Sequence, residues 1–248
     1  MWQNIFLNPE WQVLRSGWRL ILFIGLVAAV RIVVARVIER PILQPLIPAT
    51  LSSSSREMVL GCINYGLTAA IVFGAVYVML NVVERRPLSS LGLVWNNDFR
   101  IDLLVGLVIG MAIQALTLGV YLSLYRAKIT PGVISPDGTP FWIALVAGIV
   151  FYSFVGFLEE LAYRVYMMPT LAQGWNLGRI NPSLALILSL LTISIAFGLS
   201  HLRNPDVTLA DALLDAIIGG VLGLGFILTG RPALGIGIHI TYSDFLNG

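Results

Sequence analysis

Long stretches without a charged residue dominate this sequence and restrict what it can fold into. Four of them exceed 20 residues, at 58–83, 103–125, 138–158 and 180–202. A bilayer core about 30 Å thick requires roughly 20 predominantly apolar residues of helix, so each stretch is long enough to cross a membrane. The sequence therefore predicts an all-α, polytopic transmembrane helical bundle.

Further apolar stretches raise the expected number of spans to six or seven. Residues 18–38 are apolar apart from three arginines, and residues 209–229 carry two aspartates near one end. The last stretch, 232–248, is short and counts as a marginal seventh span. Prolines predict a loop after the first span, at Pro41, Pro45 and Pro48.

The composition excludes several classes of protein. Charged residues make up 11% of the chain, where about 25% is usual, and hydrophobic residues make up 57%. This is too little charge to cover a soluble globule and too much hydrophobicity for a disordered chain. A net charge of +2 leaves no basic surface for nucleic acid. The lipid bilayer is therefore the expected environment.

The chain divides into two parts at this level of description. Residues 1–57 are expected to form an interfacial segment and the first transmembrane helix, and residues 58–248 the transmembrane core. Close helix packing is expected where small residues recur at i and i+4, at Gly106 and Gly110 and at Gly219 and Gly223. We expect an integral, multi-pass protein of a bacterial-type plasma membrane with its N-terminus in the cytoplasm.

Ionisable residues at membrane depth are costly and usually mark a functional site. Glu159, Glu160 and Arg164 follow directly after an uncharged run. On a regular helix, neighbouring side chains point in different directions, so the two carboxylates are not expected to face the same partner. Glu160 and Arg164 share a face as an i, i+4 pair, which predicts an ion pair and leaves Glu159 available as a general base.

Both histidines of the chain lie in apolar segments of their own. Phe197 precedes His201 by four residues, so the phenyl ring can pack on the imidazole and orient it. His239 precedes Ser243 by four residues, and Asp244 follows one position later. Three segments with polar side chains of this type predict a shared cavity between the helices of the C-terminal two thirds.

These motifs resemble those of the CPBP intramembrane proteases, which include type II CAAX prenyl endopeptidases and Abi-like bacteriocin-processing or immunity proteins. The resemblance rests on Glu159-Glu160-x-x-x-Arg164, Phe197-x-x-x-His201 and a histidine in a last helix, all within 159–244. The segment 86–93 is similar to a short element ahead of the family's core. The resemblance implies that Glu159 and His201 activate a water, that His239 and a polar partner stabilise the oxyanion, and that Glu160 and Arg164 are structural.

The sequence departs from the family at one position. The family expects Asn or Asp four residues after the last histidine, whereas this chain has Ser243 there and Asp244 one residue later. A one-residue insertion absorbed by a π-bulge would return Asp244 to the site, and this is the favoured alignment. Alternatively, Ser243 is the aligned residue and donates through its hydroxyl. Since the chain stops at Gly248, a missing C-terminal piece and a degenerate member are further alternatives.

The predicted function is cleavage of a peptide bond in a membrane-associated peptide or protein, for which a prenylated tail is one form that the resemblance allows. No cofactor is expected, although a carboxylate and two histidines also match a zinc ligand set. A non-catalytic membrane protein of the same fold, such as an immunity factor, scaffold or transporter, is the second alternative. A protease needs Glu159 and His201 within about 5 to 6 Å, so that both can bind one water. The oligomeric state is left open.

Overall fold

The fold is described from a computed structural model, which covers residues 6–8, 13–124, 140–175, 180–205 and 207–242. It is 85% helical, and these residues contain no β-strand, which confirms the predicted all-α class. Six of its helices are long and apolar enough to cross a membrane. In the marginal seventh stretch, the described residues form the ten-residue helix α10 (Ala233–Tyr242), and these ten residues are too few to cross a membrane.

Several spans are built from more than one helical segment. The first joins α2 (Ser16–Val34), the π-helical η1 (Ala35–Leu43) and α3 (Gln44–Leu46), and the second joins α4 (Ser53–Val78) and η2 (Met79–Glu84). A 3-10 turn, η3 (Leu88–Leu91), leads to α5 (Asn97–Leu124). The fourth span joins α6 (Phe141–Glu159), η4 (Glu160–Met167) and α7 (Met168–Trp175), and α8 (Pro182–His201) and α9 (Leu209–Thr229) follow.

The first span is longer than predicted, because the helix continues through Pro41 and Pro45 to Leu46. The loop predicted at these prolines is therefore wrong for its first part. Pro41 lies inside η1, and π-helical geometry can satisfy backbone groups that a proline leaves without their usual partner. The charges at this end are also paired, since Arg31 lies 2.8 Å from Glu39.

Helix α9 shows how the bundle divides its surface between lipid and protein. One stripe of large aliphatic side chains is between 48% and 78% exposed, and it comprises Ile217, Val221, Leu224 and Leu228. The opposite stripe is buried against other helices and contains Gly219, Leu222 and Gly223. This exposure is costly in water and favourable in hydrocarbon, as expected for an integral membrane protein.

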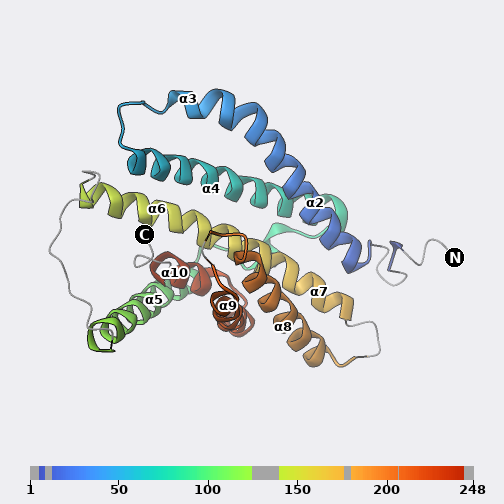
Figure 1. The fold of residues 1–248 in the computed structure, drawn as a ribbon. Coiled ribbons are helices and arrows are strands. Elements are labelled where there is room, and N and C mark those ends of the chain that lie inside the picture. Colours follow the sequence, from blue (N-terminus) through green and yellow to red (C-terminus); the bar gives the residue numbers. More distant parts are fainter. Residues whose placement is uncertain (1–5, 9–12, 125–139, 176–179, 206, 243–248) are drawn as a thin grey trace.

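The fourth span lies at the centre of the bundle. Figure 1 shows α6 and α7 running across the middle of the view, with α4 on one side and α8, α9 and α10 on the other. A core of aliphatic and aromatic side chains fixes η4 against α2 and α4, and it includes Phe23, Val76, Leu80, Leu161 and Tyr166. The opposite side of η4 is thereby held toward α8, α9 and α10.

Glycines bring α10 into backbone contact with α5. A methyl group on Gly106 would collide with the Leu234 carbonyl, and one on Gly110 would collide with Thr241. Thr241 also donates a hydrogen bond to the carbonyl of Leu107 at 3.1 Å. The close contact predicted at the first glycine pair is confirmed, and it supports α10 beside the central span.

Candidate active site

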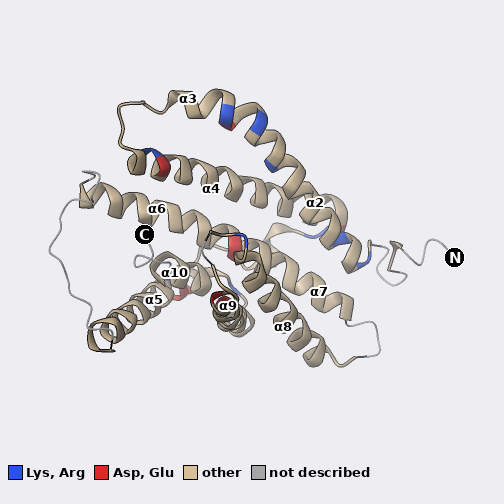
Figure 2. Ribbon diagram, in the orientation of Figure 1, with Lys and Arg blue, Asp and Glu red and all other residues tan. Residues whose placement is uncertain are grey.

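The predicted polar residues come together where α6 passes into η4. Figure 2 shows that little of the ribbon carries charge and that an acidic segment lies at the middle of the view, where α6 meets α7. Glu159 is the last residue of α6, and Glu160 begins η4. The two carboxylates therefore lie on a change of helical geometry in the central span.

Glu160 and Arg164 form the predicted i, i+4 ion pair, and it is buried. Arg164 Nη1 lies 3.0 Å from Glu160 Oε1, and neither side chain is more than 1% exposed. The contact is a charge pair without the alignment of a hydrogen bond. Arg164 Nη2 donates to the Gly219 carbonyl of α9 at 3.2 Å. The pair thus ties η4 to α9, which is a structural role.

His239 lies between the two glutamates. Its Nε2 is 3.3 Å from Glu159 Oε2, and its Nδ1 is 3.4 Å from Glu160 Oε1. The expectation that adjacent carboxylates cannot face one partner is therefore wrong. The imidazole carries nitrogens on two different edges, and the helix widens into a π-helix at Glu160, so one ring reaches both side chains.

Two glycines make room for this contact. A methyl group on Gly156 of α6 would lie 2.6 Å from the Cβ of His239. A methyl group on Gly235 of α10 would collide with the carboxylate of Glu160. Since real Cβ atoms do not approach other atoms so closely, any side chain at these positions would push the helices or the site residues apart.

His201 meets Glu159 from the end of α8. Its Nδ1 lies 2.9 Å from the backbone carbonyl of Phe197, one turn earlier. Because a carbonyl oxygen can only accept, Nδ1 carries the hydrogen, and the neutral ring has its lone pair on Nε2. That Nε2 lies 3.9 Å from Glu159 Oε1. The separation is within the 5 to 6 Å limit set from the sequence and leaves the two atoms too far apart for a direct hydrogen bond.

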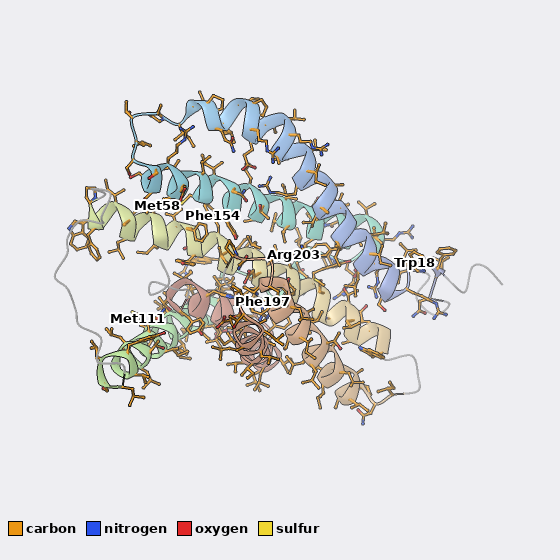
Figure 3. The ribbon with its side chains drawn as sticks, viewed as in Figure 1. Trp18, Met58, Met111, Phe154, Phe197 and Arg203 are labelled. Carbon is orange, nitrogen blue, oxygen red and sulfur yellow. The ribbon has the colours of Figure 1, made fainter. Side chains whose placement is uncertain are left out.

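Phe197 packs against most of the site, as the sequence predicted for His201. Its ring lies 4.7 Å from the His201 ring and 6.1 Å from the His239 ring. The guanidinium of Arg164 stacks over the same ring at 4.3 Å, a cation–π contact. Figure 3 places Phe197 where α8, α9 and α10 meet. This one side chain therefore orients both histidines and the arginine.

A cavity of about 820 Å³ opens beside these residues. Its walls include Glu159, His201 and His239 and also several polar side chains, among them Tyr65, Tyr152 and Asp215. The volume is in the range of sites that hold a small molecule or a short segment of a larger one. The three predicted ionisable residues are thus brought to one accessible space.

The last predicted pair, Ser243 and Asp244, lies outside the described residues.

The helix that carries His239, α10, is fixed at its N-terminal end. Arg231 donates from Nε to Asp102 Oδ2 at 2.6 Å, and this hydrogen bond raises the pKa of Arg231. Gly92, with a left-handed φ of 68°, abuts the Gly230 carbonyl at the same turn. The short element at 86–93 thereby helps to set the start of α10.

Sequence reasoning missed three contributors to the site. Asp215 lines the cavity, and its Oδ2 lies 3.9 Å from His201 Nδ1. Its signal was visible, since an aspartate inside an apolar span is a candidate functional residue. Gly156 and Gly235 carry no comparable signal, because their role depends on which helices cross. Among the described residues, no three His, Cys, Asp or Glu side chains are arranged to hold a metal ion.

Comparison with known proteins identifies the segment that carries these motifs. Residues 140–243 match the family model described as type II CAAX prenyl endopeptidase Rce1-like. The matched segment includes α6 to α10, and with them Glu159, Glu160, Arg164, Phe197, His201 and His239. No curated protein and no solved structure gives a significant match to the chain.

Proposed function

Since residues 140–243 place this chain in the CPBP family of CAAX-type intramembrane proteases, we propose that Glu159 and His201 activate a water that hydrolyses a peptide bond. The proposal rests on one observation above all. Nδ1 of His201 is committed to the Phe197 carbonyl, so Nε2 faces Glu159 Oε1 across a gap of 3.9 Å beside the cavity. A water that makes ordinary hydrogen bonds to both atoms would have an angle of roughly 90° between those two bonds, which is close to its H–O–H angle.

The proposed reaction begins with proton transfer from this water to Glu159. The water donates its second hydrogen to Nε2 of His201, which fixes the orientation of its lone pair. The oxygen then attacks the carbonyl carbon of the scissile bond, and the carbonyl electrons move onto its oxygen. When the tetrahedral intermediate collapses, the carbon–nitrogen bond breaks and Glu159 returns its proton to the leaving amine.

We propose that His239 stabilises the oxyanion. Its Nε2 faces Glu159 Oε2 at 3.3 Å in the resting site, so this nitrogen carries a hydrogen. Once Glu159 is protonated, it attracts the hydrogen on His239 Nε2 less strongly, and His239 can donate that hydrogen to the developing negative charge. Glu160 holds the opposite edge of the ring, at Nδ1, and Arg164 holds Glu160. Either Ser243 or Asp244 is the proposed second partner of the oxyanion.

We propose a membrane-associated peptide or protein as the substrate, with a prenylated tail as the form that the family's name suggests. Six spans place the site within a multi-pass membrane protein. We further propose a bacterial-type plasma membrane with the N-terminus in the cytoplasm. No cofactor takes part in the proposed reaction, because proton transfer and oxyanion binding are assigned to side chains of the chain itself.

The test is cleavage of a fluorogenic peptide with an apolar anchor by the purified protein in liposomes. We expect Glu159→Gln and His201→Ala to lower kcat by about 10²- to 10⁴-fold, as for loss of a general acid–base group. Glu57→Gln, at an exposed position in the first turns of α4, is the matched control and should retain full activity. Unchanged turnover in both site variants contradicts the proposed mechanism. A folded wild-type protein that cleaves none of a panel of anchored peptides supports the non-catalytic alternative.

A further inference from the structure

Asp215 is an acidic side chain inside a membrane span that the proposed reaction does not use. It lies on α9 and lines the same cavity as Glu159. Its Oδ2 is 3.9 Å from Nδ1 of His201, on the opposite edge of the ring from Glu159. A carboxylate at this depth is costly, so its position beside a functional imidazole requires an explanation.

The neighbouring aspartate, Asp211, caps α9, whereas Asp215 does not have that role. Asp211 accepts from the backbone N–H of Thr208 at 2.8 Å, and the Thr208 hydroxyl accepts from the Asp211 N–H, which forms a capping box. Asp215 lies one turn further into α9, where backbone N–H groups already have partners within the helix. Both aspartates thus line the same cavity from α9, but only Asp211 belongs to the capping box.

We infer that Asp215 is a positioning residue for His201 in the proposed reaction. The Phe197 carbonyl accepts the hydrogen bond of Nδ1–H at 2.9 Å, and the Asp215 carboxylate at 3.9 Å attracts the same hydrogen electrostatically, so the lone pair of Nε2 stays directed at the water site. Its negative charge also stabilises the positive charge that builds on the ring as Nε2 accepts a stronger hydrogen bond from the reacting water. The inference rests on the proposed function, because it assigns Asp215 a role only through His201.

The charges around His201 are consistent with this role. Glu159 faces the ring from α6, Asp215 faces it from α9, and His239 lies beyond Glu159 on α10. Tyr65 of α4 and Tyr152 of α6 line the same cavity. The two carboxylates near His201 therefore lie on opposite sides of the ring, each 3.9 Å from a different nitrogen.

The experiment compares Asp215→Asn, Asp215→Glu and Asp211→Asn in the same peptide-cleavage assay. Asp215→Asn keeps the shape and removes the charge, so we expect kcat to fall about 10- to 100-fold with little change in KM, as for other partners that orient a functional histidine. Asp215→Glu restores a carboxylate that can reach Nδ1 and should recover most of the lost kcat. Asp211→Asn is the matched control and should stay within about twofold of the wild type.

Three outcomes overturn the inference while the wild type remains active. They are an unchanged kcat in Asp215→Asn, an equal loss in Asp215→Asn and Asp211→Asn, and a change confined to KM. A melting temperature within a few degrees of the wild type identifies a folded variant, and Asp215→Glu decides the matter if Asp215→Asn does not fold. An inactive wild type instead overturns the proposed function together with this inference.

Discussion

Two glutamates in this membrane protein have opposite surroundings, since Glu84 is buried and Glu159 is half-buried. Glu84, at the end of η2, contacts Arg19 at 3.2 Å and accepts a hydrogen bond from the Tyr166 hydroxyl at 3.0 Å. Within the described residues, Glu159 forms its charge pairs with the imidazoles of His201 and His239, and it lies beside a cavity of about 820 Å³. The partner of the first carboxylate is an arginine, which is a permanent cation, whereas the partners of the second are two imidazoles. Glu84 is therefore suited to holding helices together, and Glu159 is suited to acid–base chemistry.

The first carboxylate also joins distant parts of the chain. Arg19 donates to Gln173 of α7 at 3.0 Å, so the cluster connects α2, η2, η4 and α7. The Arg19 and Glu84 side chains are at most 4% exposed. Breaking a buried ion pair of this kind strongly destabilises the folded protein, because one buried charge is left without its counter-charge.

Breaking the structural cluster should give the largest loss of stability. We expect Glu84→Gln to lower the free energy of unfolding by about 3 to 5 kcal/mol, since it leaves Arg19 buried without its counter-charge. The measurement is unfolding of the purified protein in a denaturing detergent series. The kcat of the folded fraction should stay near the wild-type value.

The control for this prediction uses the other arginine of the cluster. Arg86 lies 3.6 Å from Glu84, but its side chain is 42% exposed. Arg86→Gln should therefore change stability by no more than about 1 kcal/mol. A Glu84→Gln protein that is stable but inactive would contradict the comparison, because it would give both glutamates a catalytic role.

Removing the space for Glu160 should give an intermediate effect, on activity. We expect Gly235→Ala to lower kcat by about 10- to 100-fold, because the added methyl displaces the carboxylate that holds His239 at Nδ1. Gly74→Ala is the matched control, since that helical glycine has no neighbour within 4 Å of a new methyl group. Equal activity in the two variants would show that the orientation of His239 does not depend on Glu160.

Removing metal ions should have the smallest effect. Each oxygen of Glu159 faces a different imidazole, and we expect these side chains and the water between Glu159 and His201 to perform the proposed chemistry without a metal ion. Kcat should therefore survive exhaustive chelation, with less than about one metal ion per ten molecules detected in the purified protein. Loss of activity that zinc alone restores would favour the zinc-dependent alternative instead.

The sequence predicted the class of fold and the partners within one helix, because those follow from local spacing. The ion pair of Glu160 with Arg164 and the contact of Phe197 with His201 are both i, i+4 relations. The contact of His239 with two adjacent glutamates was not predictable in this way. It depends on how α10 crosses the central span and on the π-helical geometry that begins at Glu160.

The extents of the helices show the same limit. Pro41 is a strong signal for a loop in an isolated sequence, yet the helix continues through it as the π-helical η1, whose geometry can satisfy the backbone groups that a proline leaves without their usual partner. Asp215 stood out only as an aspartate near the end of a span, since its partner lies on another helix. Predictions from one sequence therefore hold within helices and become incomplete where two helices meet.

The described length of α10 has a consequence for Gln114, a residue of α5. The ten described residues of α10, which reach Tyr242, rise about 15 Å, or half of a hydrocarbon core. Gln114, a polar residue within the apolar helix α5, donates to the Tyr242 carbonyl at 2.6 Å. A side chain that is costly on α5 alone thus satisfies a backbone carbonyl in the last described turn of α10 and ties the two helices together.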